Sequence, residues 1–148
     1  MSARKPNMWH RRRARRALVQ AVYQWQLSDN SVASVLTDFQ EDDSLKKADG
    51  DFFEELLKGT IASADELDEK YVPYLDREVS RLDHVERAIL RLAAYEFVYR
   101  IDVPYRVVID EYVELAKTFG AQDSHRYING VLDNLAAQVR SIEVGSRG

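Results

Sequence analysis

The chain of 148 residues is long enough to form one domain with its own core, and its 45% hydrophobic and 31% charged residues argue against intrinsic disorder. It contains no cysteine, which excludes a disulfide framework and a thiolate metal site, and no segment approaches the ~18 apolar residues of a membrane span. The net charge of −4 is distributed unevenly: the first 28 residues hold seven cations and no acidic residue, whereas the remainder holds 14 basic and 25 acidic residues. We therefore expect a cytoplasmic protein that binds a polyanion near its N-terminus.

Apolar residues recur at helical spacing almost throughout the chain, and no segment shows the two-residue alternation of a strand. In chain order, helices are predicted at residues 10–27, 32–39, 50–64, 83–100, 104–119 and 124–139. The polar stretch at 40–49 predicts a loop. The fold class is therefore all-α, a single-domain bundle of six or seven helices over residues 11–140, with a flexible extension at 1–10 and a frayed tail at 141–148.

Several residues mark the expected helix boundaries. Asp49 is a candidate N-cap of the third helix, and Pro73 ends or bends the segment that continues from it. Gly120 is predicted to end the fifth helix in a left-handed conformation. Asp123 or Ser124 then caps the last helix.

The first helix begins with five arginines in six consecutive positions, which are Arg11, Arg12, Arg13, Arg15 and Arg16. A helical projection places Arg12, Arg16 and Tyr23 opposite the apolar side and the other arginines beside it, so we expect all five arginines to face solvent. Both the helix dipole and mutual repulsion disfavour cations here, so an anionic ligand is the expected compensation. A guanidinium can donate paired hydrogen bonds to a phosphate. The alternative is a solvated surface that binds any polyanion weakly.

Base selection in single-stranded RNA needs aromatic or planar groups that can stack on bases. Tyr23, Phe119 and Tyr127 are candidates, although each is equally compatible with a place in the core. The three histidines have no partner at metal-ligand spacing, and no phosphate-binding glycine loop or nucleophile motif is present. We therefore expect no enzymatic activity, no metal and no cofactor.

Four blocks of sequence carry a family resemblance. They are residues 11–28 (RRRARRALVQAVYQWQLS), 85–96 (VERAILRLAAYE), 102–111 (DVPYRVVIDE), and 114–133, in which ELAKTFG leads into DSHRYINGVLD. In this order they resemble the NusB family of bacterial antitermination factors, over roughly residues 11–137. The resemblance implies the all-helical fold of that family and no enzymatic activity.

The resemblance also implies partners. These are the boxA segment of single-stranded RNA in ribosomal RNA transcripts, the small-subunit ribosomal protein NusE, and an antitermination complex on RNA polymerase. The residues that match the family's RNA-binding positions are Arg11, Arg12, Arg13, Arg15, Phe119, Gln122, Asp123, Arg126 and Tyr127. Arg16 and Tyr23 join them from the helical projection. Asp123 either accepts hydrogen bonds from bases or caps the helix.

Glu86 matches a family position at the NusE interface. Leu90 and Phe97 lie beside it on the predicted fourth helix, which is apolar on two sides. Such a helix is either central in the bundle or offers one side to a partner. The alternative function is a helical protein–protein adaptor with only non-specific affinity for RNA, and the sequence also leaves a homodimer open.

Overall fold

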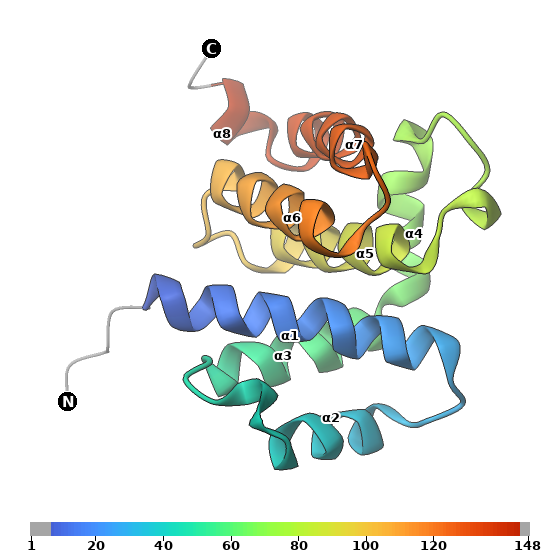
Figure 1. Ribbon diagram of the computed structural model, residues 1–148. Coiled ribbons are helices and arrows are strands. Elements are labelled where there is room, and N and C mark those ends of the chain that lie inside the picture. The colour runs from blue at the N-terminus through green and yellow to red at the C-terminus, as the bar shows by residue number, and fades with distance from the viewer. Residues whose placement is uncertain (1–6, 146–148) are drawn as a thin grey trace.

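Helices make up the regular structure of residues 7–145, the part of the chain that the computed structural model describes (Figure 1). This confirms the predicted all-α, single-domain class, and these residues contain no strand. The α-helices are α1 (Met8–Leu27), α2 (Val32–Glu41), α3 (Gly50–Ala62), α4 (Ala64–Tyr71), α5 (His84–Tyr99), α6 (Tyr105–Phe119), α7 (Ser124–Val139) and α8 (Ser141–Gly145). Three short 3-10 helices, η1 (Asp43–Leu45), η2 (Val72–Tyr74) and η3 (Val79–Arg81), lie in the connections.

Helix α1 crosses the middle of the molecule, with α2 and α3 on one side and α5, α6 and α7 on the other (Figure 1). Helix α5 packs against α1, α3, α4, α6 and α7, and every residue from 88 to 97 is buried. Its apolar character on two sides is therefore explained by a central position. Leu90 and Phe97 are fully buried, so in this structure neither side chain is available to a partner.

Side-chain caps set the start of α1 and of α5. The Asn7 side chain accepts hydrogen bonds from the amides of Trp9 and His10 at 2.9 and 3.1 Å, so α1 begins within the segment predicted to be a flexible extension. Residues 1–6 of that segment lie outside the described part of the chain. Helix α5 begins with reciprocal hydrogen bonds between Asp83 and Glu86.

The predicted third helix is two helices. Helix α3 ends at Ala62 and α4 begins at Ala64, with Ser63 between them in a non-helical conformation. Pro73 lies in η2 directly after α4, as predicted for the end of that segment. The predicted loop at 40–49 contains η1, which an apolar-spacing argument cannot detect in a polar segment.

Gly120 ends α6, but the predicted left-handed conformation is wrong, since its φ is −87°. A close approach explains the glycine instead: a Cβ atom there would lie 2.7 Å from the Ala116 carbonyl oxygen and 3.2 Å from the Ser124 side chain. The left-handed residue of this turn is Asp123, with a φ of 67°.

The C-terminal segment is anchored by Arg140, which is buried. Its guanidinium donates hydrogen bonds to the backbone carbonyls of Glu96, Phe97, Arg100 and Val103, where α5 ends, and it pairs with Glu143 at 2.6 Å. It thereby satisfies carbonyl groups that a helix C-terminus leaves without partners. Residues 141–145 form α8 where the sequence predicted a frayed tail, and 146–148 lie outside the described part. None of the helices in residues 7–145 has the length and apolar character that crossing a membrane requires.

Candidate nucleic-acid interface

The five arginines at the start of α1 fall into two groups. Arg11, Arg12 and Arg15 form ion pairs with acidic side chains on other elements. Arg13 and Arg16 are exposed, and neither forms an ion pair with any residue between 7 and 145. The two groups are interspersed along the helix, so α1 provides both cations with acidic partners and the two outward cations Arg13 and Arg16.

Arg15 belongs to the core, and the prediction that it faces solvent is wrong. It is 3% exposed and donates two hydrogen bonds to the fully buried carboxylate of Glu96 on α5, at 2.8 and 2.9 Å. Burial alone would lower the pKa of Arg15, but the hydrogen bonds and charge of Glu96 outweigh it and raise that pKa above its ordinary value. Tyr112 donates a third hydrogen bond to Glu96 at 2.6 Å, and burial together with this carboxylate raises the pKa of Tyr112 well above its ordinary value.

Arg12 and Arg11 also have internal partners. Arg12 donates to both oxygens of Glu111 on α6, at 3.2 and 2.9 Å, and this hydrogen bonding raises the pKa of Arg12. Arg11 lies 3.5 Å from the carboxylate of Asp49, which caps α3 and whose amide donates to the His10 carbonyl at 2.9 Å. The expectation that the fold offers the arginines no compensation is therefore wrong for three of the five.

The second predicted segment spans the α6–α7 turn. Gln122, Asp123 and Arg126 are exposed, whereas Phe119 and Tyr127 are half-buried. The Arg16 guanidinium lies over the Phe119 ring, 5.2 Å from its centroid. This contact brings the arginine group of α1 and the α6–α7 turn together on one surface, although they are distant in sequence.

Asp123 occupies the N-cap position of α7, but its side chain accepts no capping hydrogen bond from the helix. Of its two expected roles, base contact and helix cap, the structure therefore lacks the side-chain cap. Its carboxylate lies 3.9 Å from the Arg126 guanidinium. Ser124 does not cap α7 either. Its hydroxyl donates to Glu86 at 2.8 Å, so Glu86 links the starts of α5 and α7. Glu86 is 7% exposed, which sequence reasoning did not anticipate for a partner-binding carboxylate.

The candidate stacking aromatics differ in their surroundings. The Tyr127 ring lies under the guanidinium of Arg77, 4.0 Å from the ring centroid, so one face of the ring is covered. Tyr23 is 39% exposed, two turns along α1 from Arg16, and its ring lies roughly perpendicular to that of His84. Trp9 is exposed and its ring lies 4.9 Å from the Arg12 guanidinium. Tyr23 is therefore the more open of the three predicted aromatics.

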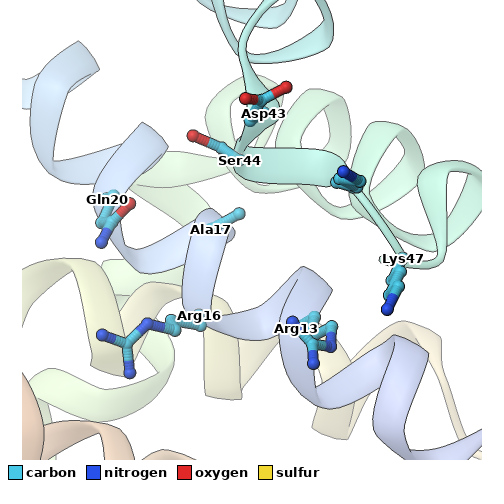
Figure 2. A pocket seen from close by; sticks show the side chains of 8 residues that line it. Arg13, Arg16, Ala17, Gln20, Asp43, Ser44 and Lys47 are labelled. Carbon is cyan, nitrogen blue, oxygen red and sulfur yellow. The ribbon is translucent and has the colours of Figure 1, made fainter.

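A groove of about 440 Å³ runs between α1 and the connection that contains η1 (Figure 2). The residues that line it are Arg13, Arg16, Ala17, Gln20, Asp43, Ser44, Lys46 and Lys47. A second groove, of about 290 Å³ between α1 and α6, is lined by Arg13 and Arg16 as well. The two outward arginines therefore border both grooves. Sequence reasoning missed Lys46 and Lys47, although adjacent lysines in an otherwise acidic loop were a visible signal.

Comparison with known proteins agrees with the resemblance read from the sequence. The model of the NusB family matches residues 12–137, which is most of the chain. The chain belongs to the NusB family. Within residues 7–145, this family member has no group of three histidine, aspartate or glutamate side chains placed to hold a metal ion.

Proteins described as transcription antitermination protein NusB are similar to this chain over nearly their whole length. The protein of Baumannia cicadellinicola is 54% identical over 88% of this chain and 94% of its own. That of Alcanivorax borkumensis is 51% identical over 93% of this chain and 91% of its own. This NusB-family member is thus a transcription antitermination factor and not an enzyme.

Two solved structures share the fold. A NusB of T. maritima superposes with a TM-score of 0.77 at 30% identity, covering 92% of this chain and 94% of its own. A chain from a crystal structure of the antitermination factors NusB and NusE in complex with double-stranded RNA gives a TM-score of 0.81, covering 89% of this chain and 99% of its own. At 23% identity the second shows the NusB fold alone.

Proposed function

We propose that this NusB-family protein binds the boxA segment of single-stranded ribosomal RNA transcripts, together with NusE, in a cytoplasmic antitermination complex on RNA polymerase. The observation that carries the proposal concerns Arg13 and Arg16, which are exposed and form no ion pair within residues 7–145, beside the exposed polar side chains of the α6–α7 turn. A solved structure described as NusB and NusE in complex with double-stranded RNA supports NusE and an RNA as partners.

Arg13 and Arg16 are the residues that hold phosphates in this proposal. Their charges have no partner within residues 7–145, so an RNA strand need not displace an internal carboxylate to reach them. Such contacts supply affinity and salt dependence but carry no sequence information. Arg11 and Arg12 contribute less because Asp49 and Glu111 already accompany them, and Arg15 acts by fixing α1 on α5.

Sequence selection is assigned to the α6–α7 turn. Gln122 offers a donor and an acceptor, Asp123 offers acceptors, and Arg126 offers donors, which together can address the edges of unpaired bases. The left-handed backbone of Asp123 leaves its carboxylate exposed and without a capping bond, which favours its RNA-contact role.

RNA bases are proposed to stack on two arginine–aromatic pairs and on one uncovered aromatic ring. Arg16 covers Phe119 and Arg77 covers Tyr127, and a guanidinium plane is itself a surface on which bases stack. Tyr23 offers an open ring farther along the same helix. In this arrangement an RNA strand would pass from the α6–α7 turn along α1.

NusE is expected at the start of α5, beside Glu86. Glu86 is buried and hydrogen-bonded to Asp83 and Ser124, so it positions the start of α5 and does not itself make the contact. The exposed residues beside it, Asp83 and His84, would contact NusE. Leu90 and Phe97 support α5 from inside.

The test is a titration of boxA RNA and of a scrambled strand of equal length, with and without NusE, over a series of salt concentrations. We expect boxA to bind more tightly than the scrambled strand and NusE to increase the difference. With about four phosphates neutralised, log K should fall against log[salt] with a slope of about −3. Equal affinity for both strands, with and without NusE, would leave only the adaptor with non-specific RNA affinity.

A further inference from the structure

The connection between α2 and α3 places a second set of unpaired cations opposite Arg13 and Arg16. Lys46 and Lys47 are exposed, line the groove of about 440 Å³, and form no ion pair with any residue of the described range 7–145. Figure 2 shows the Lys47 side chain reaching from this connection toward α1, where Arg13 lies. Asp43 is the one carboxylate in the lining, so the cations outnumber it four to one.

The connection is held in place by several short contacts. The Asp42 side chain accepts from the amide and the hydroxyl of Ser44, both at 3.0 Å. The Lys46 amide donates to the Asp43 carbonyl at 3.0 Å, and the Asp49 amide donates to the carbonyl of His10 in α1 at 2.9 Å. The wall formed by Asp43–Lys47 is therefore fixed relative to the arginines before any ligand binds.

Lys47 adds a conformational observation. Its φ is 62°, a left-handed conformation that glycine adopts without strain and that a lysine adopts rarely. The strained position nevertheless carries a long cationic side chain at the edge of the groove, and strained residues cluster at binding sites.

We infer that Lys46 and Lys47 form a second phosphate-binding wall, which with Arg13 and Arg16 grips the phosphodiester backbone of an RNA strand along the groove. The inference rests on the proposed function and extends the RNA path from α1 onto the α2–α3 connection. The groove volume of about 440 Å³ is many times the roughly 30 Å³ that one water molecule occupies, so a segment of an RNA backbone fits where a single small ion would not fill the space. It also borders Arg16, whose guanidinium covers Phe119, so the wall is continuous with the surface assigned to RNA.

The decisive variant is Lys46→Gln with Lys47→Gln, measured with boxA RNA and NusE over a salt series. Two lost phosphate contacts should reduce the steepness of log K against log[salt] by about 1.4. The ratio of wild-type to variant affinity should therefore shrink about sevenfold between about 50 and 200 mM salt. The preference for boxA over the scrambled strand should stay unchanged. Asp43→Asn should raise the affinity, because it removes the opposing charge and its side chain caps no helix in the structure.

Lys70→Gln with Arg106→Gln is the matched control, since it removes the same charge from exposed residues of α4 and α6 that do not line the groove and that form no ion pair with any residue between 7 and 145. The inference fails if the Lys46 and Lys47 variant matches this control while Arg13→Gln still lowers the slope, and the proposed function then stands. Loss of boxA preference in the wild type would instead overturn the proposed function itself. The thermal unfolding of the Lys46 and Lys47 variant should coincide with that of the control and the wild type, because none of the replaced side chains forms an ion pair within residues 7–145.

Two further binding measurements distinguish an RNA backbone from a free phosphate ion and from an acidic protein. Inorganic phosphate should compete with the RNA no better than chloride of equal ionic strength, and stronger competition would indicate a site for a free ion. A polyglutamate peptide of matched charge should bind more weakly than the RNA and lose no affinity in the lysine variant. An equal loss for the peptide would assign the groove to acidic proteins.

Discussion

Arg15 lies within one helical turn of Arg13 and Arg16 on α1, but it points into the core whereas they face solvent. Arg15 is buried against Glu96 with well-formed hydrogen bonds, whereas Arg13 and Arg16 face two grooves without an acidic partner in the described residues. The inward residue fixes the position of α1, and the outward residues are left for a ligand. A run of arginines is therefore a poor guide to function until each side chain is placed.

The largest effect in this comparison is expected from Arg15→Ala. It leaves the Glu96 carboxylate charged and buried without its cation, which should lower the free energy of unfolding by about 4 kcal/mol. Arg16→Ala, on the outward side of the same helix, should change stability by less than about 0.5 kcal/mol. Urea denaturation of both variants measures the difference.

A paired change separates the lost charge from the lost packing. Arg15→Met combined with Glu96→Gln removes both charges, and the Gln oxygen can still accept from Tyr112, so most of the stability should return. Equal losses in Arg15→Ala and Arg16→Ala would contradict the division of α1 into inward and outward arginines.

The second largest loss of stability is expected from a change in the α6–α7 turn, where Ser124 is buried and Gln122 and Arg126 are exposed. Ser124→Ala removes the hydroxyl that donates to the buried Glu86, and a hydrogen bond to a charged group contributes about 2 kcal/mol. We expect that loss in urea denaturation together with a weaker boxA preference, because the start of α7 is no longer tied to α5. Ser34→Ala, on an exposed part of α2, is the control and should change neither quantity.

A smaller, pH-dependent effect is expected from another inward pair, Asp68 of α4 with Arg91 of α5, joined at 2.9 and 2.8 Å. Burial alone would raise the pKa of Asp68, but hydrogen bonds from Arg91, Tyr71 and Arg87 outweigh it and lower that pKa. A lowered pKa stabilises the folded state above the unfolded value of about 3.9, and this contribution is lost as the pH falls through the folded-state value.

Asp68→Asn should therefore be less stable than the wild type at pH 7, and the difference should shrink as the pH falls below about 4. Asp38→Asn on the exposed side of α2 makes the same charge change without a buried partner. A pH-independent difference between wild type and Asp68→Asn, measured as urea midpoints, would refute the role of this pair.

The helices and the family could be predicted from the sequence, but the direction of individual side chains could not. Apolar spacing predicts the helices because each buries one side, and the four family blocks predict the fold and the family. Spacing alone could not show that Arg15 points inward, since its partner Glu96 is 81 positions away and on another helix. The hydrogen bonds of Arg140 to the backbone at the end of α5 likewise depend on tertiary contacts that no local pattern encodes.

The smallest effect distinguishes two adjacent exposed arginines of α1, one with an ion pair and one without. Arg13→Gln and Arg12→Gln each remove one positive charge, but Arg12 is accompanied by Glu111 whereas Arg13 has no acidic partner within residues 7–145. Arg13→Gln should therefore reduce the salt slope for boxA binding by about 0.7 and leave the urea midpoint unchanged. Arg12→Gln should change the slope less and lower the midpoint slightly, since it breaks a contact between α1 and α6. Equal slopes for the two variants would mean that the RNA displaces Glu111, and that exposure rather than pairing decides which arginines serve the ligand.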